Sequence, residues 1–353
     1  MDGSHSSTHV FVAMSGGVDS SVAAALLKEQ GYGLTGVFMK NWSGDSYGIQ
    51  ADCPWEQDQK DVEAVCSQLD IPFMTFNFEK EYRERVVGYF FEELRAGRTP
   101  NPDVMCNREI KFSLFLERAL AKGADLIATG HYARIRQDES GFHLLKGKDT
   151  AKDQSYFLHR LTQEQLAKTL FPVGEYTKPE IRTLAKKFGL ATAEKKDSQG
   201  ICFIGDINVR AFMRSGIRVH TGVIRDLDSG EIVGEHDGIE FYTIGQREGL
   251  GIGGAAKPYY VADKREDSNE LLVVMGSDHP ALFKTEAELT DLHWITDRPQ
   301  DSLAASVRYR QTPVSGDLTG STFNFDQPVR AVAPGQSVVI YSGDECLGGG
   351  IVA

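Results

Sequence analysis

The first part of the chain alternates short apolar runs with segments that carry apolar residues at helical spacing. These patterns predict strands at 9–14, 34–39, 72–78 and 125–129, and helices at 20–30, 55–69, 79–96 and 110–121. A further helix is indicated by Thr177 and Glu180, which are spaced as in a capping box ahead of an apolar stripe. Repeated strand–helix units predict a parallel sheet covered by helices, with ligands bound at the carboxyl ends of the strands.

The pattern changes after about residue 206, where short apolar runs are separated by Gly, Asp, Ser and Pro turns. The runs lie at 222–225, 240–244, 259–263, 271–275, 303–310 and 337–341. They predict two small β-barrels with a break near residues 276–285. The expected organisation is an α/β domain over 1–205, a small, mostly-β central domain over 206–278 and a C-terminal β-barrel domain over 279–353.

The 353 residues are 41% hydrophobic and 25% charged, which is typical of an ordinary globular protein. No apolar run is long enough to cross a bilayer, and residues 1–9 lack the basic and hydrophobic segments of an export signal. We therefore expect a cytoplasmic protein with no membrane partner. The five cysteines are an odd number without a C-x-x-C pair, which argues against a disulfide framework and a local metal motif.

Positive charge is concentrated in one stretch of an acidic chain. The formal net charge is -12, yet residues 151–225 contain 13 Lys and Arg against 7 Asp and Glu. Such a stretch can form a track for nucleic-acid phosphates, or it can be a solvated helical face. Charge alone leaves both interpretations open.

The most informative motif is the run Ser-Gly-Gly-Val-Asp-Ser-Ser at 15–21, between the first predicted strand and the first predicted helix. Its two glycines let the backbone approach an anion closely, and the helix start offers unpaired N–H groups with a partial positive charge. The run therefore predicts a phosphate cradle. It lacks the lysine of a Walker A loop, and it resembles the loop of the ATP pyrophosphatase family, whose members cleave ATP between its α and β phosphates.

Two cysteines stand in settings that favour a thiolate. Cys106 precedes a predicted helix, where a thiol pKa falls, and Cys202 follows Lys195 and Lys196 closely. For either one alone, a small buried hydrophobe is the commoner role. We assign that role to Cys66 and Cys346, which lie on apolar stretches, and we expect Cys53 to be structural as well.

Several separate motifs occur together in one order along the chain. They are the 15–21 loop, Gly-Arg-Thr-Pro-Asn-Pro-Asp followed by the cysteine (97–106), Ala-Thr-Gly-His-Tyr (128–132), Lys-Asp-Gln-Ser-Tyr-Phe (152–157), Asp-Ser-Gln-Gly-Ile-Cys-Phe-Ile-Gly (197–205) and Arg-Tyr-Arg-Gln (308–311). Together they resemble the bacterial tRNA-specific 2-thiouridylases of the ATP pyrophosphatase family. The likeness begins near residue 9 and extends to the chain end, so we expect residues 1–8 to lie outside the fold.

The resemblance implies both a fold and a reaction. The fold is an N-terminal pyrophosphatase domain with a parallel sheet, a small central domain and a C-terminal β-barrel. The reaction replaces the C2 oxygen of the wobble uridine, position 34 in tRNAs for Lys, Glu and Gln, with sulfur. ATP and Mg²⁺ are the implied cofactors, with no metal held by protein ligands alone, although Asp19 could contact the magnesium. A cysteine desulfurase or sulfur-relay protein would supply a persulfide.

The same resemblance assigns roles to individual residues. Cys106 would be the catalytic nucleophile and Cys202 the carrier of the persulfide, while Asp19 would act at the nucleotide. His131 could serve as a general base, but we expect it instead to orient the loop beside Gly130. The residues that would bind ATP are Ala13, Met14, Ser15, Gly16, Gly17, Val18, Asp19, Ser20, Met39 and Gly130. Asn101, Pro102 and Asp103 would contact the target base, and Lys152, Asp153, Gln154, Arg308 and Tyr309 would bind tRNA.

Three other functions share some of these features. An ATP-dependent amidating synthetase would use the same phosphate loop, but this chain shows no glutaminase module. A non-catalytic RNA-binding protein would explain the basic stretch and the barrels, but not an intact phosphate loop. A third possibility is a thiolation enzyme in which Cys106, Cys202 and Asp103 hold an iron–sulfur cluster, which the persulfide route of the family disfavours.

Overall fold

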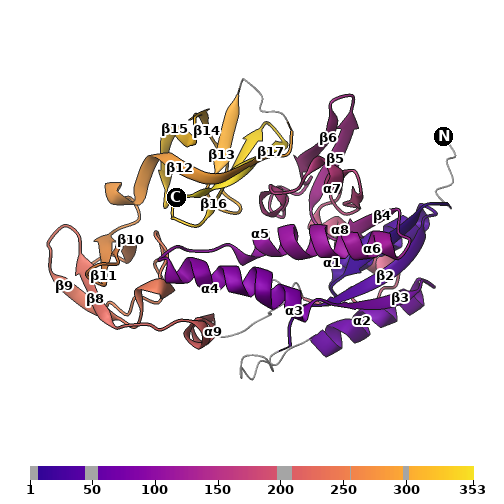
Figure 1. The fold of residues 1–353 in the computed structure, drawn as a ribbon, viewed down its shortest axis with the longest axis horizontal. Helices are drawn as coiled ribbons and strands as arrows, with labels where there is room; N and C mark the ends of the chain where they lie inside the picture. The colour runs from indigo at the N-terminus through magenta and orange to yellow at the C-terminus, as the bar shows by residue number, and fades with distance from the viewer. Residues whose placement is uncertain (1–6, 44–54, 197–208, 255, 297–301) are drawn as a thin grey trace.

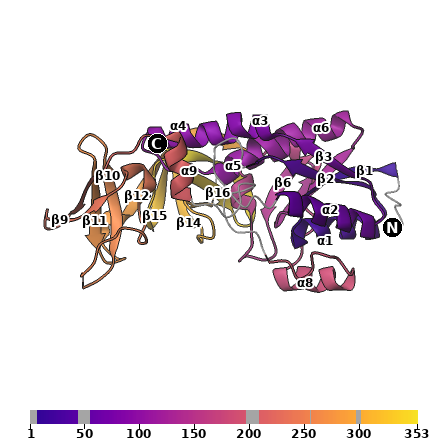
Figure 2. The same cartoon turned by 90° about the horizontal axis from the view of Figure 1, so that it is seen from below.

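The computed structural model describes residues 7–43, 55–196, 209–254, 256–296 and 302–353. The molecule is elongated, with a parallel sheet at one end, a four-stranded sheet at the other and a β-barrel between them (Figure 1, Figure 2). Within the described ranges, none of the helices is both long enough and apolar enough to cross a bilayer.

The parallel sheet has five strands in the order β3-β2-β1-β4-β7. Their bounds are β1 His9–Met14, β2 Gly33–Lys40, β3 Phe73–Asn77, β4 Leu126–Thr129 and β7 Thr169–Leu170. The central strand β1 and its neighbour β2 are buried on both faces, which is why they read as continuous apolar runs. The predicted parallel sheet is confirmed.

Helices cover both faces of this sheet. On one face lie α1 Val18–Glu29, α2 Trp55–Gln68 and α8 Lys178–Lys187. Two long helices cover the other face. The first consists of α3 Glu79–Tyr82, a π-helical segment Arg83–Val87 and α4 Gly88–Arg95. The second consists of α5 Pro102–Cys106, a π-helical segment Asn107–Leu114 and α6 Phe115–Ala121. Residues of β1 alternate between the two cores, with Val10 and Val12 facing the first and Phe11 and Ala13 facing the second.

The helix that the sequence placed at 110–121 begins earlier, at Pro102, so that predicted start is wrong. The Oδ1 atom of Asn101 accepts a hydrogen bond from the N–H of Val104 at 3.3 Å and caps the helix. Pro102 occupies the first turn, where its missing N–H costs nothing. Cys106 therefore lies inside a helix rather than in the loop ahead of one.

A β-hairpin that the sequence did not predict connects the first domain to the barrel. It consists of β5 Ala133–Asp138 and β6 Gly141–Lys146. Strand β6 pairs with β17 of the barrel, where Leu144 lies opposite Cys346 and Leu145 opposite Glu345. The hairpin is followed by a 3-10 helix Ser155–Leu158 and by α7 Gln163–Leu166. The barrel and the first domain thus share one sheet.

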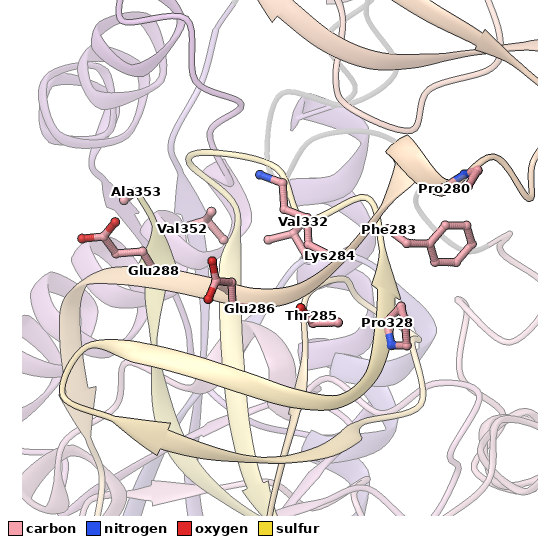
Figure 3. A pocket seen from close by; sticks show the side chains of 11 residues that line it. Pro280, Phe283, Lys284, Thr285, Glu286, Glu288, Pro328, Val332, Val352 and Ala353 are labelled. Carbon is pink, nitrogen blue, oxygen red and sulfur yellow. The ribbon is translucent and has the colours of Figure 1, made fainter. Parts of the chain in front are cut away.

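The C-terminal barrel is antiparallel and closes through the pairing of β12 with β17. Its strands are β12 Phe283–Trp294, β13 Leu303–Ser306, β14 Val314–Thr319, β15 Thr322–Arg330, β16 Ser337–Ser342 and β17 Glu345–Val352, and a 3-10 helix Pro280–Leu282 precedes them. The predicted barrel is confirmed. An open hollow on its surface is lined by residues of β12 and the chain end, and none of the predicted site residues lines it (Figure 3).

The central domain contains a four-stranded sheet in the order β10-β11-β8-β9, and its described pairings leave it open rather than closed into a barrel. The elements are α9 Val209–Gly216, β8 Gly222–Asp226, β9 Ile232–His236, a 3-10 helix Ile239–Phe241, β10 Tyr259–Arg265 and β11 Glu270–Met275. The strand predicted at 240–244 is wrong, because the chain turns at Gly238 (φ 144°) and forms the 3-10 helix. Helix α9 was not predicted.

Candidate nucleotide and thiol site

The glycine loop joins β1 to α1, as the sequence predicted. Ala13 and Met14 end the buried strand, and α1 begins at the buried Val18. Gly17 occupies the N-cap position in an extended conformation, and no described side chain caps the helix there. The first N–H groups of α1 and its positive end therefore face the loop, as an anion site requires.

Two glycines allow neighbouring elements to press against this loop. Gly16 has φ 76°, and a Cβ atom on it would lie 2.7 Å from the carbonyl oxygen of Asp58 in α2. A Cβ atom on Gly130, which follows β4, would lie 2.7 Å from the backbone nitrogen of Ser20. No other residue type fits at either position without displacing backbone. The cradle is thus built from the ends of β1 and β4 and the starts of α1 and α2.

The serine hydroxyls of the loop divide into two roles. The Oγ atom of Ser21 donates to the carbonyl oxygen of Gly17 at 2.8 Å, and that of Ser20 donates to the same oxygen at 3.2 Å. These two buried hydroxyls hold the turn in shape. Ser15 is exposed, and its backbone N–H donates to Ser20 Oγ at 3.2 Å. Its hydroxyl is therefore the one best placed to meet a ligand.

Asp19 is held by two groups from distant parts of the chain. Lys178 Nζ donates to both carboxylate oxygens of Asp19 at 2.8 Å, and the hydroxyl of Tyr132 donates to Oδ1 at 2.7 Å. Lys178 is the first residue of α8, and the predicted capping box fixes that helix start, because Glu180 Oε2 accepts from the N–H of Thr177 at 2.6 Å. A lysine ammonium thus lies beside a loop that has none of its own.

A second lysine ties the chain to α2 next to the loop. Lys195 Nζ lies 2.7 Å from Asp58 Oδ1 and 2.5 Å from Asp61 Oδ2. Burial opposes its charge, but the two carboxylates outweigh burial and raise the pKa of Lys195. These contacts fix the described chain at Lys195 next to the nucleotide cradle. Cys202 itself lies outside the described residues.

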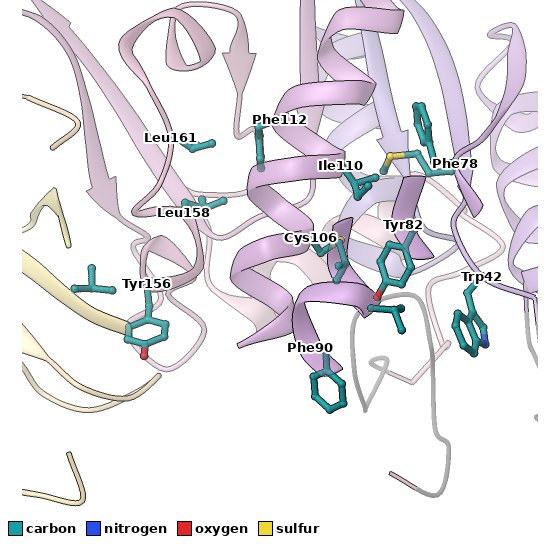
Figure 4. Packing of buried hydrophobic residues seen from close by; sticks show 14 of the residues in the cluster. Trp42, Phe78, Tyr82, Phe90, Cys106, Ile110, Phe112, Tyr156, Leu158 and Leu161 are labelled. Carbon is teal, nitrogen blue, oxygen red and sulfur yellow. The ribbon is translucent and has the colours of Figure 1, made fainter. Parts of the chain in front are cut away.

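Cys106 is fully buried at the end of α5, where the π-helical turn begins. Its side chain lies in the apolar core on the second face of the sheet, close to Tyr82 and Ile110 (Figure 4). π-helical turns are rare and frequently occur at functional sites. A substrate atom can reach this thiol only after some of the covering side chains move.

The other described cysteines are structural, as expected. Cys66 is 1% exposed, and burial, with a smaller contribution from Glu63, raises its pKa to about 11. Cys346 is fully buried in β17, and burial raises its pKa as well. Both are neutral thiols at physiological pH. Cys53 lies outside the described residues.

Met39 and His131 lie where the strands of the parallel sheet end. Met39 is buried at the next-to-last position of β2. Burial, together with the charge of Lys111, holds the pKa of His131 well below its usual value. The Nδ1 atom of His131 lies 2.7 Å from the hydroxyl oxygen of Thr129. These contacts agree with an orienting role for His131 beside Gly130.

The predicted base-contacting residues begin the helix that carries Cys106. Asn101 caps this helix, Pro102 is in its first turn and Asp103 follows. All three are half-buried. The helix therefore places them one turn from the thiol of Cys106.

The segment 152–154 is bonded tightly to the first domain. The carboxylate of Asp153 accepts from the N–H of Gly147 at 2.9 Å, and burial raises its pKa. Gln154 Oε1 accepts from the N–H of Tyr132 at 2.9 Å. These two side chains shape the loop, whereas Lys152 is half-buried at its start.

Arg308 and Tyr309 bring the barrel to the same region. The Nη2 atom of Arg308 donates to the carbonyl oxygen of Ile244 at 2.6 Å, and burial lowers its pKa. The ring of Tyr309 lies 4.5 Å from that of Phe157, which follows the 152–154 segment closely. The structure therefore brings together the two segments that the resemblance assigns to tRNA.

Three family models match the chain in order: a tRNA methyl transferase HUP domain over residues 8–206, a tRNA methyl transferase PRC-barrel domain over 210–275 and an aminomethyltransferase beta-barrel domain over 284–352. The tRNA-specific 2-thiouridylase MnmA of Bacillus cytotoxicus is 51% identical over 98% of this chain and 94% of its own length. That of Lactococcus lactis subsp. lactis is 52% identical over the same shares. The chain belongs to the tRNA-specific 2-thiouridylase family.

The family assignment made from the motifs is thereby confirmed. Among solved structures, a 4-thiouridine synthetase in complex with RNA and ATP matches this 2-thiouridylase family member with a TM-score of 0.37 and 16% identity, over 60% of this chain and 50% of that one.

Sequence reasoning missed one charged residue of the candidate nucleotide site. Lys178 was visible only as part of a capping box, and no local pattern links it to Asp19, which lies far away in the sequence. The absence of a lysine in the glycine loop was the one available signal, because a phosphate cradle needs a cation from elsewhere.

Proposed function

We propose that this protein is a tRNA-uridine 2-sulfurtransferase. It uses ATP to adenylate the C2 oxygen of uridine 34 in tRNAs for Lys, Glu and Gln, and then replaces that oxygen with sulfur to give 2-thiouridine, AMP and pyrophosphate. The observation that carries the proposal is the phosphate cradle at 15–20 on one face of the parallel sheet and a helix with a buried cysteine on the other face, in a chain of the 2-thiouridylase family. The site of action would be the cytoplasm.

The cradle fits the triphosphate of ATP. Gly16 and Gly17 keep the backbone of the loop free of side chains, Ser15 offers an exposed hydroxyl, and Lys178 supplies a positive charge. Mg²⁺, bound to the ATP phosphates and to Asp19, would neutralise charge that develops on the leaving pyrophosphate. The carboxylate of Asp19, now bonded to Lys178, would exchange this partner when nucleotide binds.

Adenylation is needed because the oxygen on C2 of uracil is a poor leaving group. In the proposed first step this oxygen attacks the α-phosphorus of ATP, and pyrophosphate leaves. The C2 carbon then carries AMP, which departs readily. Asn101, Pro102 and Asp103 would hold the flipped-out base, since their helix also presents Cys106.

Sulfur would come from a persulfide on Cys202, charged by a cysteine desulfurase or sulfur-relay protein. The terminal sulfur of the persulfide attacks C2, and AMP leaves. The thiolate of Cys106 then attacks the inner sulfur of Cys202, which breaks the S–S bond, leaves the thiocarbonyl on the base and forms a Cys106–Cys202 disulfide. A cellular thiol reduces that disulfide and completes the cycle.

The proposed tRNA contacts follow the junction between the first domain and the barrel. Lys152, Asp153 and Gln154 would meet the tRNA on one side, and Arg308 and Tyr309 on the other. Since Asp153 and Gln154 are bonded to backbone groups, their main role would be to fix the loop that presents Lys152.

The decisive experiment compares adenylation with thiolation. Cys202→Ser is expected to abolish 2-thiouridine at position 34, measured by mass spectrometry of nucleosides after reaction with ATP, a persulfide donor and unmodified tRNA. Pyrophosphate release on the first turnover should persist in this variant. Asp19→Ala should instead reduce pyrophosphate release itself. Normal thiolation by Cys202→Ser would remove the persulfide role, and ATP-dependent amidation of a nucleotide by the wild type would point to a synthetase.

A further inference from the structure

Asn41 follows the last residue of β2, at the carboxyl edge of the parallel sheet. Its side chain is 2% exposed, and neither Oδ1 nor Nδ2 has a hydrogen-bond partner among the residues that the structure describes. Buried side-chain amides are nearly always hydrogen-bonded, because an unpaired one loses its bonds to water without replacement. This amide therefore needs a partner from outside the described chain.

The backbone on both sides of Asn41 is fixed. Lys40 forms an ion pair with Glu79 at 3.2 Å. The ring of Trp42 packs edge-on against Phe212 of α9, with 5.7 Å between centroids. The amide is thus presented from a rigid segment, as in a preorganised binding site.

The position of Asn41 places it at the proposed reaction centre. In the pairing of β1 with β2, Met14 lies opposite Phe38, so the end of β2 runs beside the glycine loop. Met39 packs in the same core cluster as Cys106. Trp42 packs in that cluster too, so the residues flanking Asn41 place the chain at this point on the Cys106 side of the sheet.

We propose that the carboxamide of Asn41 binds the edge of a nucleobase. Its Nδ2 donor and Oδ1 acceptor complement an adjacent acceptor and donor, a pattern that adenine presents at N1 and N6 and uracil presents at an oxygen and N3–H. The inference rests on the proposed function, which brings both bases to this sheet edge. The bound base supplies the two hydrogen bonds that no described residue provides to the amide.

Asn41→Leu tests this directly, because leucine has a similar volume and no polar atoms. The ligand-free variant should have a higher thermal unfolding midpoint than the wild type, since an unpaired buried amide is removed. It should also bind one ligand at least tenfold more weakly. Calorimetric titration with ATP alone reports on adenine, and the ratio of affinities for tRNA transcripts carrying U34 or C34 reports on uracil.

Thr192→Val is the matched control. Thr192 is 1% exposed, its Oγ1 also has no described partner, and it lies after α8 rather than at the end of β2. Valine should raise the unfolding midpoint without changing either affinity. A lower midpoint for Asn41→Leu, or unchanged affinities for ATP and for U34 transcripts, would overturn the inference. Absence of 2-thiouridine with the wild-type protein would instead count against the proposed function.

Discussion

Replacing Lys178 by methionine should weaken both the fold and the nucleotide site. Methionine keeps most of the side-chain volume but leaves the Tyr132 hydroxyl as the remaining described partner of the Asp19 carboxylate. The side chains of Lys178 and Asp19 are 13% and 30% exposed. Breaking a fully buried pair costs about 3–5 kcal/mol and an exposed pair about 0–1. For this intermediate case we expect a loss of about 1–2 kcal/mol in the free energy of unfolding.

The effect on ATP affinity follows from the same charge. Without Lys178, an uncompensated carboxylate stands at the phosphate cradle, and a cation is missing. At an effective dielectric constant of about 20, a unit charge roughly 6–8 Å from a phosphate contributes about 2–3 kcal/mol. After some screening by salt, ATP affinity should fall by about 10- to 100-fold.

Calorimetric titration with ATP and urea unfolding measure the two effects separately. Lys148→Met serves as the control, because Lys148 pairs with Glu180 in a pair that is about half exposed (50% and 47%). This control should change stability by at most about 0.5 kcal/mol and leave ATP binding unaltered. Asp19→Asn combined with Lys178→Met should recover part of the lost stability. Wild-type ATP affinity in Lys178→Met would refute the electrostatic reasoning.

Three further predictions concern the hairpin, the thiol and the loop. Burial opposes protonation of His143, but hydrogen bonds to Glu345 and Asp138 outweigh burial and raise the pKa of His143 above 6.5. The protonated histidine therefore stabilises the fold fully below that pH, and this stabilisation is lost as pH rises through the folded-state pKa. The free energy of unfolding, measured in urea, should therefore decline as pH increases above about 6.5, and less so in His143→Gln. Cys106 should react with iodoacetamide at least about 100-fold more slowly in the free protein than in urea, because its thiol is fully buried. Gly16→Ala should lose about 1–3 kcal/mol of stability and most ATP binding. Residue 16 has a positive φ, and a Cβ atom there would clash with the carbonyl oxygen of Asp58.

Each of these has an outcome that would contradict it. Equal pH slopes for the wild type and His143→Gln would show that the hairpin histidine is not linked to folding. Peptide mapping that finds Cys106 labelled as fast as an unfolded thiol would contradict its burial. Gly123→Ala is a suitable comparison for the loop variant, because Gly123 also has positive φ (92°) but faces open space. Equal ATP affinities for the two alanine variants would show that the close approach at Gly16 is unimportant.

The strands and helices of the first domain could be predicted because their own residues specify them. β1 is an unbroken apolar run, and α8 has its capping box, so both appeared in the structure as expected. The start of the helix at Pro102 was missed because two nearby prolines suggested an extended loop, whereas the side chain of Asn101 caps a helix. Local rules failed where a single hydrogen bond decided the conformation.

Features that depend on distant partners could not be predicted. The pairing of Asp19 with Lys178 is set by the packing of α8 beside α1, and no short-range pattern encodes it. Much of the positive charge at 151–225 is likewise neutralised by partners, since Lys195 and Lys178 bind carboxylates. Charge counted along the sequence therefore overstates the positive charge available to a polyanion.

The pairing of β6 with β17 has a consequence for how the protein is made. The ribosome synthesises the β5–β6 hairpin about 200 residues before β17, the strand to which β6 is bonded. Strand β17 also seals the barrel against β12. Strand β6 therefore gains its second neighbour only once β17 has been synthesised, and a nascent chain that stalls before β17 would leave that edge of β6 unpaired.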